Sequence, residues 1–211
     1  MNFKHNSYCL THAISMVPRR FRDNQSIKIY GARNEEKTIS DQGVVYSPPT
    51  VGHVVGDTRT YDIDTVIGVG LNGCQQFDNP QIAYHGTPFE NFSQIKDANF
   101  QLSAEFYGAV WTELAYGKGV YLTPSFTMAQ MYGADGREGN LQDNHNNEYG
   151  CILVFKCVVD AAQIEYKAPT GYFKLVDGWK HGELEWIIRD KKFCQIQEVV
   201  FSYFKKSPQN Q

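Results

Sequence analysis

The sequence predicts an α+β fold, and three observations lead to this prediction. Runs of β-branched and aromatic residues recur from residue 81 onward, as in strands separated by turns. Two short segments between the early runs carry helix-start signals. Aromatic residues make up 14% of the chain, which suits strands, a pocket that stacks planar rings, or both. The 211 residues are enough for one core of ordinary size, so we expect one compact domain with extensions.

Residues 1–80 are expected to form an N-terminal extension of loops and short strands packed on the core. The first part is mixed in composition and polar, and no long amphipathic periodicity runs through the extension. Short extended pieces follow, interrupted by glycines and by Pro48-Pro49. These pieces are residues 26–30, 43–46 and 61–67.

Residues 81–206 are expected to form the main domain, and residues 207–211 a disordered tail. A helix is predicted over residues 126–132, with Ser125 as its N-cap. The strongly polar residues 140–148 are predicted to be an exposed loop. Strands are predicted at residues 82–84, 120–122, 151–159, 186–188 and 198–204.

A second helix start is predicted directly after the first of these strands. Thr87 and Glu90 have the spacing of a capping box, and Pro88 stands at the first helical position. We therefore expect Thr87 to be an N-cap and the helix to run to about Lys96.

Gly68, Gly70 and Gly73 form a G-x-G-x-x-G motif, the pattern of a dinucleotide-binding turn. In that fold the last glycine enters a helix whose N-terminus holds the pyrophosphate. Here residues 78–80, Asp-Asn-Pro, would stop any helix within two turns, and no long alternation of strands and helices follows. We predict a glycine-rich turn between strands instead.

The charge balance and the apolar pattern exclude other classes of protein. The chain has 20 Lys+Arg against 23 Asp+Glu, a formal net charge of -3, so nucleic acid is not expected as a partner. No apolar run approaches the roughly 20 residues that cross a bilayer, and the start lacks the apolar segment of a signal peptide. Membrane contact is therefore not expected.

The cysteines indicate a reducing compartment. They are odd in number and form no C-x-x-C pair, which argues against a disulfide framework and against a zinc site. The six histidines are scattered without metal-ligand spacing, so no metal is expected. The cysteines are Cys9, Cys74, Cys151, Cys157 and Cys194.

Three segments place polar groups at strand ends or beside glycines. They are Ala83-Tyr84-His85-Gly86-Thr87, Gly117-Lys118-Gly119-Val120-Tyr121-Leu122 and Glu183-Leu184-Glu185-Trp186-Ile187-Ile188. In order, spacing and local sequence, these segments resemble the His-Tyr-Glu class of ADP-ribosyltransferases, the poly(ADP-ribose) polymerase-like superfamily. The resemblance covers about residues 81–204. It implies an ADP-ribosyltransferase fold, in which two packed, mainly antiparallel sheets form an NAD cleft with short flanking helices.

The resemblance also implies a role for individual residues, with NAD as the substrate. His85 matches the histidine that hydrogen-bonds the adenine-side ribose, and Gly86 matches the glycine whose backbone grips the nicotinamide carboxamide. Tyr121 matches the tyrosine that packs on the nicotinamide ring, and Tyr132 matches the second stacking tyrosine. Glu185 matches the catalytic glutamate, whose negative charge suits a ribose that becomes positive as nicotinamide leaves.

Further positions bear on the acceptor and on the product. The serine and the preceding lysine of chain-elongating members are here Ala129 and Met128, which favours transfer of a single ADP-ribose. Glu183 forms a Glu-x-Glu pair with Glu185, as in the arginine-modifying toxin class, where the first glutamate addresses the acceptor. Trp179, in the loop before it, is expected to contact a protein acceptor.

The sequence thus predicts a mono-ADP-ribosyltransferase that modifies a protein side chain, with Thr87 as a further contact to the adenine ribose. Two alternatives remain open: a non-catalytic module that binds NAD or ADP-ribose, and a transferase directed at nucleic acid, of the ADP-ribosylation or RNA 2′-phosphotransferase type. We expect a monomer that acts in a reducing cytosol. Both an endogenous enzyme and a secreted effector delivered into a host cell fit these features.

Overall fold

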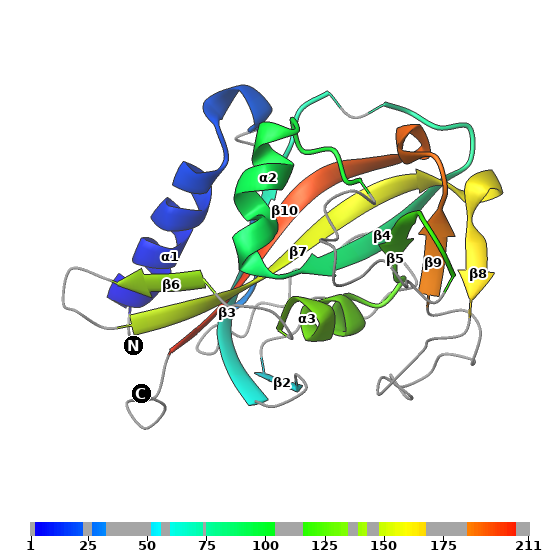
Figure 1. Cartoon of the computed structure of the whole chain (residues 1–211). Helices are drawn as coiled ribbons and strands as arrows, with labels where there is room; N and C mark the ends of the chain where they lie inside the picture. The colour runs from blue at the N-terminus through cyan, green and yellow to red at the C-terminus, as the bar shows by residue number, and fades with distance from the viewer. Residues whose placement is uncertain are drawn as a thin grey trace.

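The computed structural model describes residues 3–22, 27–32, 52–55, 60–73, 75–103, 116–134, 139–142, 148–167 and 185–205. Within these ranges the chain forms three α-helices and ten strands (Figure 1). The helices are α1 (Phe3–Met16), α2 (Phe92–Asp97) and α3 (Phe126–Ala134). The strands are β1 (Lys28–Ala32), β2 (Gly52–Val55), β3 (Thr60–Gly70), β4 (Pro80–Thr87), β5 (Val120–Leu122), β6 (Gly139–Gln142), β7 (Glu148–Asp160), β8 (Glu165–Lys167), β9 (Glu185–Ile188) and β10 (Cys194–Lys205).

The strands form two antiparallel sheets, which confirms the predicted α+β class. The large sheet has the order β1-β3-β10-β7-β4, with β2 paired to β3 and β6 paired to β7. The small sheet has the order β5-β9-β8. Strands from both sides of residue 80 lie in the large sheet, so β3 of the expected N-terminal extension pairs directly with β10 of the expected main domain.

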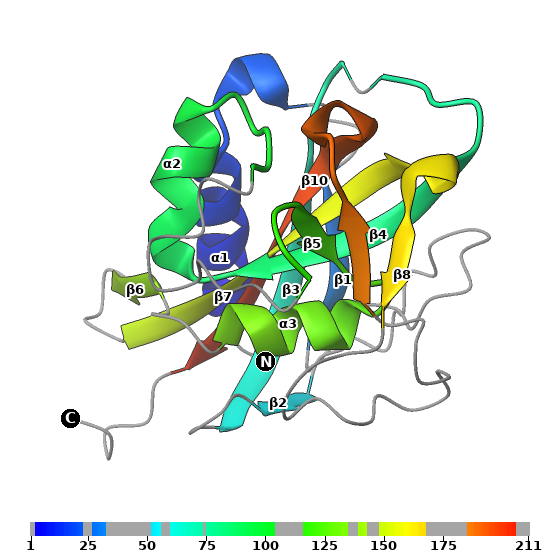
Figure 2. The same cartoon turned by 45° about the vertical axis from the view of Figure 1, so that its right-hand side comes forward.

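The large sheet is buried on both faces, because helices cover each of them. Helices α1 and α2 lie on one face and α3 lies on the other (Figures 1 and 2). Along β7, Leu153 and Phe155 belong to the core under α1 and α2, whereas Ile152 and Val154 belong to the core under α3. This alternation follows from the period of two in a strand.

Helix α1 corrects the expectation of loops at the N-terminus. Cys9, Ala13 and Val17 are fully buried and follow one another at intervals of four residues, so they form one stripe that packs on the large sheet. The stripe is narrow and includes a cysteine and an alanine, and in the rest of the helix polar residues alternate with apolar ones such as Leu10 and Ile14. The sequence of this segment therefore shows little of the apolar periodicity that predicts a helix, although its buried face is apolar.

The capping box predicted at Thr87 is wrong. Thr87 is the last residue of β4 and pairs with Leu153, so it has no role as a cap. A 3-10 turn (Phe89–Asn91) precedes α2, and Asn91 donates a side-chain hydrogen bond of 2.9 Å to Thr87 Oγ1. At the other predicted helix, Ser125 Oγ does accept the backbone N–H of Met128 at 3.2 Å, which confirms this cap.

The strands predicted after residue 80 are all present, and β1 and β3 match two of the earlier extended pieces. Strands β2, β6 and β8 were not predicted, and β6 corrects the expected loop because it occupies residues 139–142. Gly68 and Gly70 lie inside β3 rather than in a turn, and only Gly73 lies beyond its end. The expected strand at 43–46 and the expected tail at 207–211 lie outside the described residues.

Among the helices that the structure describes, none is long and apolar enough to cross a membrane.

Candidate functional site

The two sheets are joined by backbone hydrogen bonds next to the candidate site. Tyr84 on β4 and Thr123, just after β5, exchange both of their backbone bonds, with N–H to O distances of 2.7 and 2.9 Å. This bridge places the residue after Tyr84 beside the end of β5. His85 Nδ1 lies 2.8 Å from the backbone oxygen of Tyr121, so the first two predicted site residues are brought together.

His85 has a defined protonation state in this position. Its side chain is only 6% exposed, and burial lowers its pKa from 6.5 to about 4, although the hydrogen bond to the Tyr121 carbonyl acts in the opposite direction. A carbonyl oxygen only accepts hydrogen bonds, so Nδ1 must carry the proton. Nε2 of the neutral ring is then a hydrogen-bond acceptor, which suits a hydroxyl group of a ligand.

Glu185 and Tyr121 share one face of the small sheet. Tyr121 pairs with Ile187, and Glu185 lies two residues before Ile187 on the same strand, so both side chains project to the same side. The opposite face of these strands packs into the core through Val120, Leu122, Trp186 and Ile188. Burial raises the pKa of the Tyr121 phenol, and the negative charge of Glu185 raises it further, which reflects the closeness of the two groups. Glu185 itself is only 7% exposed.

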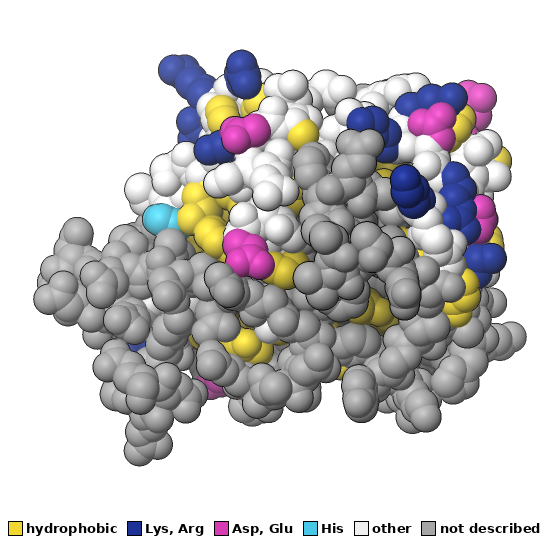
Figure 3. All heavy atoms as spheres, viewed as in Figure 1, with side chains coloured by type: hydrophobic (Ala, Val, Ile, Leu, Met, Phe, Trp, Pro, Cys, Tyr) yellow, Lys and Arg dark blue, Asp and Glu magenta, His cyan; other side chains and the backbone are white. Residues whose placement is uncertain are grey.

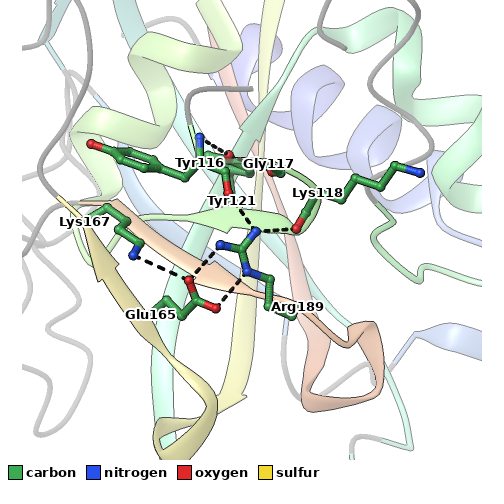
Figure 4. A network of polar contacts seen from close by, with 7 residues as sticks. All are labelled: Tyr116, Gly117, Lys118, Tyr121, Glu165, Lys167 and Arg189. Carbon is green, nitrogen blue, oxygen red and sulfur yellow. Dashed lines mark hydrogen bonds and ion pairs between the residues drawn. The ribbon is translucent and has the colours of Figure 1, made fainter. Parts of the chain in front are cut away.

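The hydroxyl of Tyr121 is held by the loop that precedes β5 (Figure 4). It donates to the Gly117 carbonyl at 2.9 Å and accepts the backbone N–H of Tyr116 at 3.1 Å. Gly117 has a φ of +79°, a left-handed conformation that residues with a side chain adopt at a cost, which accounts for a glycine here.

Arg189 binds this loop to the small sheet. This residue was not identified from the sequence. Its Nη1 donates to the carbonyls of Tyr116 and Lys118, at 2.8 and 2.6 Å. Its Nε and Nη2 donate to the two carboxylate oxygens of Glu165, at 2.8 and 2.7 Å (Figure 4). The signal in the sequence was an arginine two residues after Ile187, which puts it on the same face as Glu185.

Gly86 lies against α3. A Cβ atom at this position would stand 1.7 Å from the carbonyl oxygen of Ala129, so glycine allows the helix to approach β4. Tyr132 follows Ala129 by three residues, one turn further along α3, and is half-buried. Helix α3 thus lies against the end of β4 that carries His85, with Ala129 and Gly133 at the contact.

Of the other predicted site residues, Thr87 is described, and Glu183 and Trp179 are not. Thr87 is 3% exposed and accepts a hydrogen bond from Asn91. Glu183 and Trp179, the expected acceptor-binding residues, lie outside the described residues. In the part of the chain that the structure describes, no group of three or more His, Cys, Asp or Glu lies close enough together to hold a metal ion.

Charged side chains of both signs gather around β8 and β9 (right-hand side of Figure 3). The pairs include Lys167 with Glu165 at 3.6 Å and Lys192 with Asp190 at 2.9 Å. The carboxylates of Glu165 and Asp190 are thus both paired with basic side chains.

No protein-family model matches the chain, and no curated protein is similar enough to count as a match.

Proposed function

We propose that this protein is a mono-ADP-ribosyltransferase, which transfers ADP-ribose from NAD to a side chain of a protein acceptor and releases nicotinamide. The observation that supports it best is the convergence of His85, Tyr121 and Glu185. These residues come from three strands and two sheets, yet the bridge at Tyr84 and the shared face of the small sheet bring them to one place. In this proposal, the two antiparallel sheets correspond to the two sheets of the ADP-ribosyltransferase fold.

The role proposed for each residue follows from the chemistry of its side chain or backbone. His85 accepts a hydrogen bond from a hydroxyl of the adenine-side ribose at Nε2, since its Nδ1 proton is used on the Tyr121 carbonyl. The ring of Tyr121 packs on nicotinamide, as does that of Tyr132. Gly86 offers its backbone N–H and C=O to the carboxamide.

Glu185 stabilises the charge that develops in the reaction. The bond between ribose C1′ and the nicotinamide nitrogen breaks, and its electron pair leaves with nicotinamide, so the ribose becomes cationic. The acceptor side chain then supplies an electron pair for the new bond to C1′ and loses its proton, which Glu183 would receive. A carboxylate about 4 Å from the cation is worth about 4 kcal/mol at an effective dielectric of 20, or about a thousandfold in rate.

A single transfer is proposed rather than chain elongation because of α3. Ala129 and Met128 stand where elongating enzymes of the resembled family carry a serine and a lysine. Both side chains are apolar, and both are fully buried here, so neither offers a polar group to a growing polymer.

The Glu185→Gln variant tests the proposal. Wild type and variant are incubated with labelled NAD and a cell extract, and labelled peptides are identified by mass spectrometry while nicotinamide release is measured. We expect Glu185→Gln to lower transfer by about a thousandfold and to keep most NAD binding, since the carboxylate acts mainly in the transition state. Glu90→Gln, at an exposed position, is the matched control and should leave transfer unchanged.

Three results would contradict the assignment. Unchanged transfer by Glu185→Gln would show that this carboxylate is not catalytic. Tight NAD binding by wild type without any labelling would instead favour the non-catalytic binding module, and labelling confined to RNA or DNA would favour the nucleic-acid transferase.

A further inference from the structure

We infer that Arg189 is a positioning residue for Tyr121, which it holds through the loop at residues 116–118. The inference rests on the proposed function, because it assigns the geometry of the Tyr121 ring to a residue outside the NAD-contacting set. It concerns the binding of nicotinamide in particular.

Arg189 holds the loop through two backbone carbonyls. Arg189 Nη1 donates to the carbonyls of Tyr116 and Lys118, the two residues that flank Gly117. Gly117 in turn accepts the hydrogen bond of the Tyr121 hydroxyl. The arginine therefore fixes the peptide groups on either side of the Gly117 carbonyl, which is one of the two backbone groups that orient the phenol (Figure 4).

Arg189 is itself held in place by side chains of β8. Glu165 binds it in a bidentate arrangement, through both carboxylate oxygens. Such a fork-to-fork pair adds geometric definition as well as attraction. Lys167 lies 3.6 Å from the same carboxylate and its ammonium stands 5.7 Å from the centre of the Tyr116 ring, so β8 contacts the loop directly as well.

The contacts at this position require an arginine. Arg189 makes four hydrogen bonds in two directions at once, toward a carboxylate and toward two backbone carbonyls. A guanidinium has five donors in a rigid plane and can do this, whereas a lysine ammonium is a compact charge with three donors on a flexible stem. The side chain is 41% exposed, so the ion pair alone contributes little to stability. The four hydrogen bonds of Arg189 therefore determine mainly the geometry of the loop at residues 116–118.

The variants Arg189→Gln and Arg189→Lys test this role, with Lys192→Gln as the control. Lys192 is an exposed lysine near the same strand end that pairs with Asp190, so its replacement removes a nearby positive charge without touching the loop carbonyls. Two readouts are used on folded protein. One is the pair kcat and KM for NAD, from nicotinamide release; the other is the ¹⁹F resonance of 3-fluorotyrosine incorporated at position 121.

For Arg189→Gln we expect KM to rise about tenfold and kcat to stay within about twofold, because ring stacking is made in the ground state and kept in the transition state. The fluorine resonance should move or broaden, and both effects should be smaller in Arg189→Lys. Lys192→Gln should match wild type. Arg189→Lys also serves if Arg189→Gln does not fold.

An unchanged KM and an unchanged fluorine resonance in both arginine variants would overturn the inference, as would equal changes in Lys192→Gln. The test separates this inference from the proposed function. If wild type released no nicotinamide, the proposed function would fail, whereas the fluorine resonance would still decide whether Arg189 positions Tyr121.

Discussion

The buried, neutral His85 predicts a specific loss of stability in mild acid. Its pKa is about 4 in the folded chain, against 6.5 for an ordinary histidine, which we take for the unfolded chain. Between these pH values the unfolded chain binds a proton at this residue and the folded chain does not, so falling pH favours unfolding. The contribution of His85 is fully present above pH 6.5 and is lost as the pH falls toward 4.

The two pKa values set the size of the effect. At pH 5 the unfolded chain is almost fully protonated at His85 and the folded chain hardly at all, which corresponds to about 2 kcal/mol in the free energy of unfolding. At pH 4 and below the total reaches about 3 kcal/mol. At pH 7.5 the effect is negligible, since both states are neutral.

Urea denaturation of wild type and His85→Asn at pH 7.5 and pH 5 measures this effect. The asparagine amide can replace the Nδ1 donor to the Tyr121 carbonyl but does not titrate. Other groups, including the half-buried His12, titrate in both proteins and cancel in the comparison. We expect wild type to lose about 2 kcal/mol more than the variant between the two pH values. Equal losses, or a larger loss in the variant, would refute the reasoning.

Two further predictions concern packing. Gly86→Ala should lower the free energy of unfolding by about 2–3 kcal/mol, because its Cβ would overlap the Ala129 carbonyl on α3 and force the helix off β4; a shift in the urea midpoint equivalent to less than about 0.5 kcal/mol would contradict it. The thiols of Cys9 and Cys151 should resist brief alkylation at pH 8 in the folded protein, since burial raises the pKa of each. Peptide mapping checks this, and modification of either thiol at the rate seen in urea would count against it.

The parts of the fold that the sequence predicts well have local causes. Strand β5 was predicted with its true bounds and β9 to within one residue, because short apolar runs end at glycines or at charged residues there. The cap of α3 was predicted because Ser125 acts on a backbone group only three residues away.

The features that were predicted wrongly or not at all depend on residues elsewhere in the chain. Thr87 looks like an N-cap in its local sequence, but pairing with Leu153 holds it in β4. In α1 the buried stripe includes a cysteine and an alanine, which carry little hydrophobic signal until β3 is known to lie beneath them. Arg189 forms hydrogen bonds with Glu165 and with the loop at residues 116–118. Because these partners are far from Arg189 in the sequence, no local sequence pattern predicts the hydrogen bonds.

In the candidate site, too, some features follow from the local sequence and others from contacts between distant segments. The order of His85, Tyr121 and Glu185 in the sequence suggested that they meet, but only the register of β5 against β9 puts the last two side chains on one face. A shift of this register by one residue would turn Glu185 into the core.

The backbone bridge between Tyr84 and Thr123, which joins the two sheets, has a consequence for how this protein can evolve. Because Tyr84 and Thr123 are bridged through peptide groups alone, nineteen of the twenty amino acids can supply the hydrogen bonds at either position. Proline is the exception, since it lacks the N–H. Neighbouring side chains can therefore change during evolution while the spacing between His85 and Tyr121 is kept.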